Sequence, residues 1–431
     1  MRTVFSADWV LPVSAPPIRN GAVAVEDGRI AAVGTQDELG RGLDYPDSAI
    51  LPGLVNAHSH LEYAVYAGFG DGLPFAPWIA IHIERKARIG LPEMEAIARL
   101  GAAECLASGI TTIGDCSFSG AAATACAELG LKAIVYLEVF GFSSTEQLQT
   151  RFEANRDRIA HVLSDRVRLG ISPHSLYSAS PEVWEAANEL GLPMASHLAE
   201  SEAEREWLAH GTGPFAEHLP PAREPASVWT LADRGLLSQR LTFAHCVYVD
   251  DEEIELLARH GVSVAHCPRS NALLGCGIAP LRRLLDAGLT VGLGTDSPAS
   301  APSFDMFEEL RAAVFFARAR ERHPEALTAT EALELATLGS ARALGLADEV
   351  GSLEPGKRAD LVVLSLEGSP FVPWEDPAAA VVLGGSPAGV AATVVDGEVR
   401  YERGAFDWHE LRQKGTNARD RLLGLAGNRG A

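Results

Sequence analysis

The sequence lacks any apolar run that approaches the ~20 residues needed to cross a bilayer. Its first residues also lack the basic start and the long apolar core of a secretory signal. The six cysteines show no C-x-x-C spacing and stand mainly in apolar segments, which indicates buried reduced thiols rather than a disulfide framework. These absences predict a cytoplasmic protein that does not enter membranes.

Positive charge is also scarce. The chain has 36 Lys and Arg residues against 57 Asp and Glu residues, and its formal net charge is -21. A polyanion would be repelled before contact, so neither nucleic acid nor an anionic membrane is an expected partner. The chain has 431 residues, of which 47% are apolar and 22% charged, so we expect a large globular domain and a smaller one.

Short β-like runs occupy both ends of the chain. Residues 22–34 and 392–400 each contain an Asp-Gly turn between strand-like runs, and residues 359–364 form a further apolar run. Neither end has enough strands for a stable sheet by itself. We therefore expect the two ends to combine into one small β-domain.

Between these ends, short apolar runs alternate with helical patterns, which is typical of βα units and a parallel sheet. Eight of these runs are predicted strands, and they end near His60, Asp115, Val139, His174, His197, His245, Cys267 and Asp296. Eight units in about 300 residues predict an α/β protein with a closed (β/α)8 TIM barrel. In such a barrel, catalytic groups gather at the carboxyl ends of the strands.

The apolar run 52–60 ends in His58 and His60. Alternate side chains of a strand share a face, so these two imidazoles can converge on one cation. His197, His245 and Asp296 each close a further apolar run, and a barrel would bring them to the same mouth. Three imidazoles and one carboxylate suit Zn²⁺, with Fe²⁺ as an alternative, and leave a coordination position for water.

Glu200 follows His197 by three residues, just past a predicted strand end. A bound dication lowers the pKa of water from about 15.7 to near 7, but expelling an amine from a heteroaromatic carbon also requires proton transfers. A carboxyl at position 200 would lie beside the metal water and shuttle these protons. The alternative is a first-turn glutamate that favours the helix dipole. His245 could orient the water, or it could be a hydrogen-bonded histidine of the core.

Taken together, these motifs closely resemble the amidohydrolase superfamily and, more narrowly, its deaminase and chlorohydrolase branch. The resemblance extends over nearly the whole chain and rests on residues 52–60, His197 with Glu200, and residues 244–246, 266–271, 294–296 and 351–361. It implies that residues 52–351 form the metal-dependent barrel. It also implies that residues 1–51 and 352–431 together form a β-sandwich domain.

The same resemblance implies roles for the site residues. The implied metal ligands are His58, His60, His197 and Asp296. Glu200 is then the proton shuttle, and His245 and Asp296 orient the attacking water. Barrels of this branch are often dimeric, so a homodimer is the implied assembly.

One absence narrows the branch. Two-metal members of the superfamily bridge their metals with a carboxylated lysine on the fourth strand, and residues 167–174 contain no lysine. The resemblance therefore implies one metal ion per chain. It favours hydrolytic deamination over hydrolysis of cyclic imides or of dihydroorotate.

Further motifs bear on the substrate. Residues 172–178 are similar to the strand-four motif of adenosine-type deaminases, in which the histidine, here His174, faces the substrate. Glu84 stands in a region that binds ribose hydroxyls in relatives. Relatives that act on S-adenosylhomocysteine hold its carboxylate with arginines after the third strand, and residues 135–142 contain none, which argues against that substrate. Three segments look more like 6-aminodeoxyfutalosine deaminases of menaquinone biosynthesis, namely residues 58–62, 138–141 and 211–214.

The resemblance thus predicts a metal-dependent deaminase of a small purine nucleoside, with 6-aminodeoxyfutalosine as the preferred substrate and the 6-oxo nucleoside and ammonia as products. Alternatives within the enzyme class are deamination of adenosine, methylthioadenosine or a guanine-type base, and dechlorination of a triazine. A non-catalytic barrel scaffold is the alternative from another class. Such scaffolds have typically lost metal ligands, whereas this chain keeps the complete set.

Overall fold

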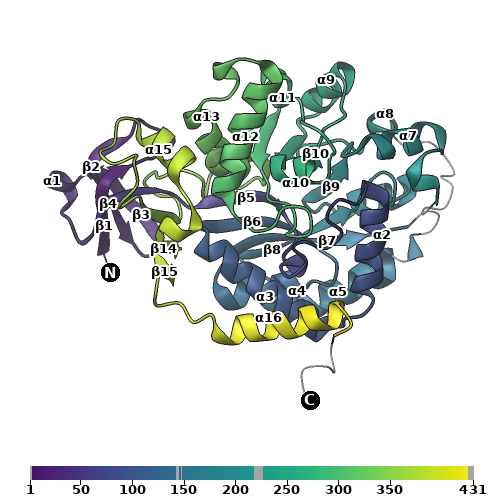
Figure 1. Ribbon diagram of the computed structural model, residues 1–431, viewed down its shortest axis with the longest axis horizontal. Helices are drawn as coiled ribbons and strands as arrows, with labels where there is room; N and C mark the ends of the chain where they lie inside the picture. Colours follow the sequence, from purple (N-terminus) through teal and green to yellow (C-terminus); the bar gives the residue numbers. More distant parts are fainter. Residues whose placement is uncertain (1, 142–144, 147, 218–226, 426–431) are drawn as a thin grey trace.

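The computed structural model describes residues 2–141, 145–146, 148–217 and 227–425, and it contains two sheets (Figure 1). The larger sheet has eight parallel strands, which are neighbours in the order in which they occur along the chain. They are β5 (Leu54–Ser59), β6 (Ile110–Ser117), β7 (Lys132–Val139), β8 (Val167–Pro173), β9 (Met194–Leu198), β10 (Leu241–His245), β11 (Ser263–His266) and β12 (Thr290–Leu293). All eight strands of the predicted barrel are therefore present.

Helices follow the strands and cover the outside of the barrel (Figure 1). They are α2 (Phe75–Lys86), α3 (Leu91–Ala107), α4 (Ala121–Leu129), α5 (Glu153–Ile159), α6 (Pro181–Glu189), α7 (Glu202–His210), α8 (Val228–Asp233), α9 (Asp251–Arg259), α10 (Pro268–Leu273), α11 (Leu281–Asp286), α12 (Met306–Glu321), α13 (Ala329–Glu334) and α14 (Ser340–Ala343). Because helices cover one face and the barrel interior covers the other, β5, β6 and β7 are buried along their whole length. This arrangement confirms the (β/α)8 barrel.

The barrel closes between its last strand and its first. The backbone N–H of Asp296 donates to the carbonyl of His58 at 3.0 Å. Asn56 and Thr295 exchange two further hydrogen bonds, from Asn56 Nδ2 to Thr295 Oγ1 at 2.7 Å and from Thr295 N to Asn56 Oδ1 at 3.0 Å. Closure therefore sets the end of β5 beside the end of β12, although more than 200 residues separate them.

The second sheet combines both chain ends, as predicted. Its strands lie in the order β15-β14-β13-β4-β1-β2-β3. Their bounds are β1 (Arg2–Val10), β2 (Ile18–Glu26), β3 (Arg29–Thr35), β4 (Leu43–Pro52), β13 (Leu361–Ser365), β14 (Val390–Val395) and β15 (Glu398–Glu402), with α1 (Gln36–Leu39) and α15 (Pro377–Gly384) beside them. One apolar core joins Ile30 of β3 to Val394 of β14, near opposite edges of the sheet, so the sheet folds over itself as a sandwich.

Both predicted Asp-Gly turns form hairpins. Asp27 and Gly28 have φ angles of 49° and 77°, and Asp396 and Gly397 have φ angles of 50° and 76°. Two successive positive φ angles define the tight turn that suits the twist of a two-stranded hairpin, and glycine adopts such angles without strain.

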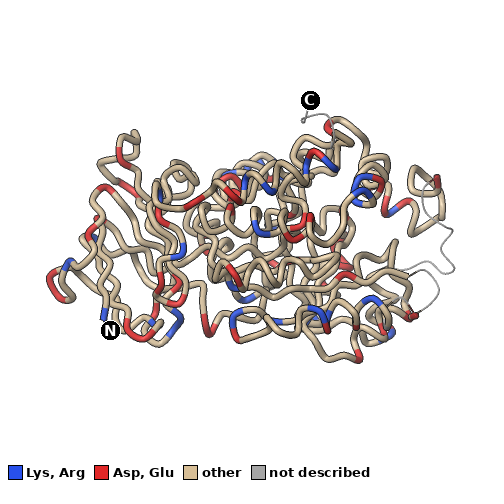
Figure 2. The backbone as a smooth tube through the Cα atoms, turned by 90° about the horizontal axis from the view of Figure 1, so that it is seen from below, with Lys and Arg blue, Asp and Glu red and all other residues tan. Residues whose placement is uncertain are grey.

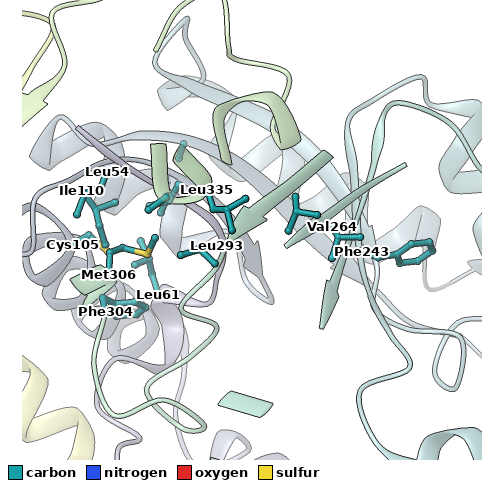
Figure 3. Packing of buried hydrophobic residues seen from close by; sticks show 14 of the residues in the cluster. Leu54, Leu61, Cys105, Ile110, Phe243, Val264, Leu293, Phe304, Met306 and Leu335 are labelled. Atoms are coloured by element: carbon teal, nitrogen blue, oxygen red, sulfur yellow. The ribbon is translucent and has the colours of Figure 1, made fainter. Parts of the chain in front are cut away.

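The main core lies between the barrel and its helices. Figure 3 shows part of this packing, in which Leu54, Leu61, Cys105, Ile110, Phe304 and Met306 lie close together. Each of these side chains is at most 1% exposed. All six cysteines are buried and free, which confirms the interpretation of their spacing.

The C-terminal helix α16 (His409–Leu422) extends away from the sandwich and lies along α3 (Figure 1). Arg419 of α16 donates hydrogen bonds to the carbonyls of Val65 and Ala67, and its guanidinium lies 4.4 Å from the ring centre of Phe69. The last helix thus binds the connection that follows the first barrel strand. The domain boundaries at residues 51/52 and 351/352 stay a prediction.

Charged residues of both signs are interspersed over the molecule (Figure 2). Among the described residues, no helix combines the length and the apolar composition that a membrane-spanning helix requires.

Candidate metal centre and active site

Six candidate residues meet at the carboxyl ends of four barrel strands. By strand they are His58 and His60 at β5, His197 and Glu200 at β9, His245 at β10, and Asp296 after β12. Each of the six is at most 7% exposed. The structure therefore brings all of the metal and catalytic candidates to one buried mouth of the barrel.

The ligand atoms lie at distances that suit a shared cation. Asp296 Oδ1 lies 3.6 Å from His58 Nε2 and 3.4 Å from His60 Nε2, and His60 Nε2 lies 3.2 Å from His197 Nε2. Ligands bound at about 2.0–2.2 Å in a tetrahedral zinc site stand roughly 3.3–3.6 Å apart. These side chains can hold one divalent ion with little movement.

In His60 and His197, Nδ1 donates a hydrogen bond to a backbone carbonyl, which leaves Nε2 available to a metal. His60 Nδ1 donates to the carbonyl of Cys116 at 2.9 Å, and His197 Nδ1 donates to the carbonyl of His174 at 2.6 Å. A carbonyl only accepts, so the proton of each ring lies on Nδ1 and the lone pair on Nε2. His58 Nε2 is sealed from solvent and has no hydrogen-bond partner among the described residues. An orphaned atom beside two free lone pairs fits a metal ion.

Two serines orient the carboxylate of Asp296. Ser270 Oγ donates to Asp296 Oδ2 at 2.7 Å, and Ser300 Oγ donates to the same oxygen at 2.6 Å. Both serines are fully buried. Because Oδ2 is occupied by these bonds, Oδ1 is the oxygen that faces His58 and His60.

The electrostatics favour the protonation states that metal binding requires. Burial opposes ionisation of Asp296, but the neighbouring imidazoles of His58, His245 and His60 hold its pKa well below its usual range. Burial, together with His58, lowers the pKa of His60 to about 3. Burial likewise lowers the pKa of His197. At neutral pH Asp296 is therefore ionised and the rings of His60 and His197 are neutral, the forms that coordinate a cation.

Several site residues adopt strained backbone angles. Ala199, His245 and Asp296, which lie at or just after the ends of three strands, have φ angles of 49°, 73° and 55°. Residues other than glycine rarely adopt such angles, which cost of order 1–3 kcal/mol each and gather at functional sites. The strand ends turn sharply here to direct side chains into the mouth.

Glu200 and His245 form an acid and an acceptor beside the centre. Glu200 Oε2 lies 3.7 Å from His245 Nε2. Burial, followed by the charges of Asp296 and Glu204, raises the pKa of Glu200 well above its usual range, which favours the protonated form of its carboxyl. His245 Nδ1 donates to Asn271 Oδ1 at 2.9 Å, which leaves the lone pair of His245 on Nε2. This pair can give and take protons at one substrate atom.

The two predicted substrate residues have different locations. The ring of His174 lies 4.6 Å from the ring of His197, beside the centre. The side chain of Glu84 is 66% exposed and pairs with Arg88 at 2.5 Å. The structure therefore places His174 near the metal ligands and leaves Glu84 on the surface, because position 84 of α2 faces outward.

The sequence interpretation missed three charged residues near the mouth. Glu138 is the penultimate residue of β7 and is 3% exposed. Lys86 lies 4.1 Å from the ring centre of Phe118, and Arg151 lies 3.5 Å from that same ring centre. Arg151 lies beyond residues 135–142, so the missing arginine in that stretch is no longer an argument against an acidic substrate. Glu138 was within a quoted motif, but Lys86 and Arg151 carried no signal because only the fold brings them together.

Comparison with protein families agrees with this site. The family model described as the amidohydrolase family matches residues 49–400. A second model, described as the bacterial imidazolonepropionase-like composite domain, matches residues 21–41.

Two relatives span most of the chain. The chain is 35% identical over 428 residues to the 5-methylthioadenosine/S-adenosylhomocysteine deaminase of Nitratidesulfovibrio vulgaris strain Hildenborough, with 93% of this chain and 92% of that protein covered. It is 33% identical over 402 residues to the 5'-deoxyadenosine deaminase of Methanothermobacter thermautotrophicus, with 90% of this chain and 91% of that protein covered.

Solved structures show the same architecture. An adenosine deaminase from Xanthomonas campestris with bound zinc is 30% identical, superposes with a TM-score of 0.87 and covers 98% of both chains. An atrazine chlorohydrolase from Arthrobacter aurescens complexed with zinc is 24% identical, with a TM-score of 0.82 over 97% of this chain and all of the other, and shows the fold alone. The family match over most of the sequence, the full-length relatives and the clustered histidines show that this chain belongs to the amidohydrolase family.

Proposed function

We propose that the chain is a zinc-dependent hydrolase with one metal ion that removes the 6-amino group of an adenine-type nucleoside as ammonia. The observation that carries this proposal is the convergence of His58, His60, His197 and Asp296 beside Glu200 and His245 in one buried mouth. Deaminase relatives that are 33% to 35% identical over nearly the whole chain support the same reaction.

The proposed zinc ligands are the Nε2 atoms of His58, His60 and His197 and Oδ1 of Asp296. A structural relative with bound zinc supports this metal. Bound there, Zn²⁺ supplies Lewis acidity that lowers the pKa of a coordinated water from about 15.7 to about 7. The fourth barrel strand, β8, contains no lysine that could bridge a second metal, which supports a single ion.

The chain's own residues then move the protons. Glu200, whose raised pKa favours the protonated form, gives its proton to a ring nitrogen of the purine, which makes the amino-bearing carbon electrophilic. His245 accepts a hydrogen bond from the attacking water through Nε2 and orients it. As the carbon–oxygen bond forms, Glu200 takes the proton of the water and delivers it to the amino nitrogen. The carbon–nitrogen bond breaks and ammonia leaves, the second proton of the former water passes from the new hydroxyl to Glu200, and the products are the 6-oxo purine and ammonia with Glu200 protonated again.

The preferred substrate in this proposal is 6-aminodeoxyfutalosine, an adenine nucleoside with an aromatic acid on its 5' side. The segments 58–62 and 138–141 support it by their resemblance to deaminases of that nucleoside. Lys86 and Arg151, both on the ring of Phe118, support a substrate that carries an acidic and aromatic substituent. The same cations fit S-adenosylhomocysteine, which the relatives favour as a second candidate.

Ammonia release from a panel of compounds tests the proposal. The panel contains 6-aminodeoxyfutalosine, S-adenosylhomocysteine, methylthioadenosine, 5'-deoxyadenosine, adenosine and guanine, with chloride release from a chlorotriazine measured in parallel. We expect the highest kcat/KM for 6-aminodeoxyfutalosine. A higher value for another nucleoside would overturn the substrate assignment alone. A zinc content near zero after expression with zinc supplied, without turnover, would favour the non-catalytic scaffold.

A further inference from the structure

Glu204 holds the turn that carries Glu200. Its Oε1 accepts a hydrogen bond from the backbone N–H of Ala199 at 3.1 Å, and its Oε2 accepts one from the backbone N–H of Glu200 at 2.8 Å. The side chain of Glu204 is fully buried. The two oxygens of one carboxyl group therefore bind two consecutive peptide groups between the end of β9 and the start of α7.

These hydrogen bonds reach beyond the cap of the helix. Ser201 is the N-cap residue of α7, and its hydroxyl oxygen accepts from the backbone N–H of Glu204 at 3.1 Å. In an ordinary capping box, an acidic residue at the position of Glu204 binds the N–H of the N-cap residue itself. The N–H groups of Ala199 and Glu200 precede the N-cap, so their bonds to Glu204 fix the preceding turn rather than the helix.

The turn that Glu204 holds is strained. Ala199 has a φ angle of 49°, in the left-handed region that residues other than glycine rarely adopt. Such a backbone persists only where the surrounding structure holds it. The carbonyl of Ala199 accepts from the N–H groups of Val247 and Tyr248 at 3.1 and 3.0 Å, so Ala199 is held through its N–H and its carbonyl alike.

The same contacts join the turn after β9 to the turn after β10, which carries His245. Arg205, the neighbour of Glu204, donates a hydrogen bond to the carbonyl of Tyr248 in that second turn. Across the two turns, Glu200 Oε2 lies 3.7 Å from His245 Nε2. Without the acceptors of Glu204, two buried N–H groups would lose their partners, and the strained turn would relax away from this arrangement.

We propose that Glu204 is a positioning residue that holds Glu200 in the direction that proton transfer requires. This inference rests on the proposed function, because the proton transfers of Glu200 belong to it. The oxygens of Glu204 are occupied by backbone N–H groups, so Glu204 acts through Glu200 and not on the substrate.

The test replaces one of the two acceptors by means of Glu204→Gln. An amide has a single acceptor oxygen, so its NH2 group would face a backbone N–H and one of the two bonds would be lost. We expect kcat to fall by about 100-fold, the effect of displacing a catalytic group by about 1 Å, while KM and zinc content stay near those of the wild type. The assay uses the nucleoside that the wild type deaminates fastest. It is run at about pH 8.5, because burial raises the pKa of Glu204 to about 7 and its carboxyl is ionised above that value.

A double variant separates positioning from a merely structural role. In Glu200→Gln no proton shuttle remains to be positioned, so adding Glu204→Gln should change kcat by about twofold or less. Ser201→Ala is the matched control, because it removes the cap of α7 but leaves both acceptors of Glu204, and its kcat should stay within a few-fold of the wild type. A crystal structure of Glu204→Gln should show Glu200 turned away from His245.

An unchanged kcat in Glu204→Gln would overturn the inference, and so would a loss of the same size in the Glu200→Gln background. A zinc content that falls together with kcat would also overturn it. Should Glu204→Gln not fold, Glu204→Asp, whose carboxylate is one methylene shorter, takes its place with the same expectations. Absence of wild-type turnover on every nucleoside would overturn the proposed function, whereas an unmoved Glu200 in the crystal structure would overturn the positioning role alone.

Discussion

At the scale of single residues, the site depends on hydrogen bonds that fix protons rather than on the ligands alone. The carbonyls of Cys116 and His174 hold the protons of His60 and His197 on Nδ1, and Asn271 holds the proton of His245 there. Each of these three rings consequently presents a lone pair at Nε2 toward the mouth. The fourth ring, His58, faces the same space with an Nε2 that has no hydrogen-bond partner in the described part of the chain.

Replacing Glu200 should impair the catalytic step without impairing metal binding. We expect Glu200→Gln to lower kcat by about 100- to 10,000-fold, because a proton shuttle contributes that much, while zinc content stays near one per chain. Steady-state kinetics and metal analysis check this together. Glu202→Gln, which alters an exposed glutamate in the first turn of α7, is the control and should retain activity. Retained turnover in Glu200→Gln would remove Glu200 from the mechanism.

Ser300 should affect zinc affinity, because its hydroxyl orients the carboxylate of Asp296. In Ser300→Ala, Asp296 Oδ2 loses one of two hydrogen bonds, the carboxylate can rotate, and we expect zinc affinity to fall by about 10- to 100-fold. Competition with a chelator measures the affinity. Ser48→Ala, which removes a buried hydroxyl in the sandwich domain, is the matched control and should leave the affinity unchanged. Equal affinities in the two variants would contradict an orienting role for Ser300.

At the scale of elements, helix α16 connects the end of the chain to the barrel. It packs along α3, and Arg88 just beyond α2 donates to the carbonyl of Leu422 at 2.9 Å. Together with the bonds of Arg419, this contact fixes the connection that carries α2 and therefore Lys86. A helix outside the barrel thus helps to hold one wall of the mouth.

Glu104, a residue of α3, predicts how the stability of the protein depends on pH. Burial raises the pKa of Glu104 to about 7 from its ordinary 4.5, and Arg412 of α16 opposes this only in part. The contribution of Glu104 to stability is therefore fully present below pH 4.5 and is lost as pH rises through about 7. Glu104→Gln, which stays neutral, should unfold like the wild type near pH 5 and be more stable by up to about 3 kcal/mol at pH 8.

Thermal or urea unfolding of both proteins across this pH range measures the difference. Because the metal centre titrates equally in both, subtraction isolates Glu104. A constant difference between wild type and Glu104→Gln from pH 5 to pH 8 would contradict a raised pKa in the folded state.

At the scale of the whole molecule, a buried ion cluster joins the barrel to the sandwich. Lys132 at the start of β7 pairs with Asp360 at 2.5 Å and with Asp396 at 2.7 Å, and Arg166 pairs with Asp396 at 2.9 Å. Lys132 and Asp360 are at most 6% exposed. The cluster lies at the amino ends of the barrel strands, away from the mouth, so it belongs to stability rather than to catalysis.

Loss of Lys132 should therefore destabilise the protein without altering its chemistry. We expect Lys132→Met to lower the free energy of unfolding by about 3–5 kcal/mol, because it leaves two acidic groups without their ammonium partner. The double variant Lys132→Met with Asp360→Asn should recover part of this loss. Urea unfolding measures both. A loss below about 1 kcal/mol in the single variant would contradict a net role for the cluster.

The sequence alone determined the periodicity and therefore the architecture. Apolar runs bounded by turns predicted all eight barrel strands, and Asp-Gly pairs predicted the two terminal hairpins, because local backbone preferences suffice for both. Six candidates were also visible, because each lies at or just after the carboxyl end of a strand, which a barrel converts into its mouth. They are His58, His60, His197, Glu200, His245 and Asp296.

Only the tertiary structure decided what surrounds these candidates. Ser270 and Ser300 meet at Asp296, and Glu138 meets the charges of Lys86 and Arg151, through contacts between segments whose spacing carries no local signal. Glu84 and Lys86 are two residues apart on one helix, so their side chains diverge by roughly 200° around its axis, and only packing determines which of them faces inward. The sequence specified the strands and the ligands through local physics, whereas side-chain direction and hydrogen-bond partners followed from closure of the barrel.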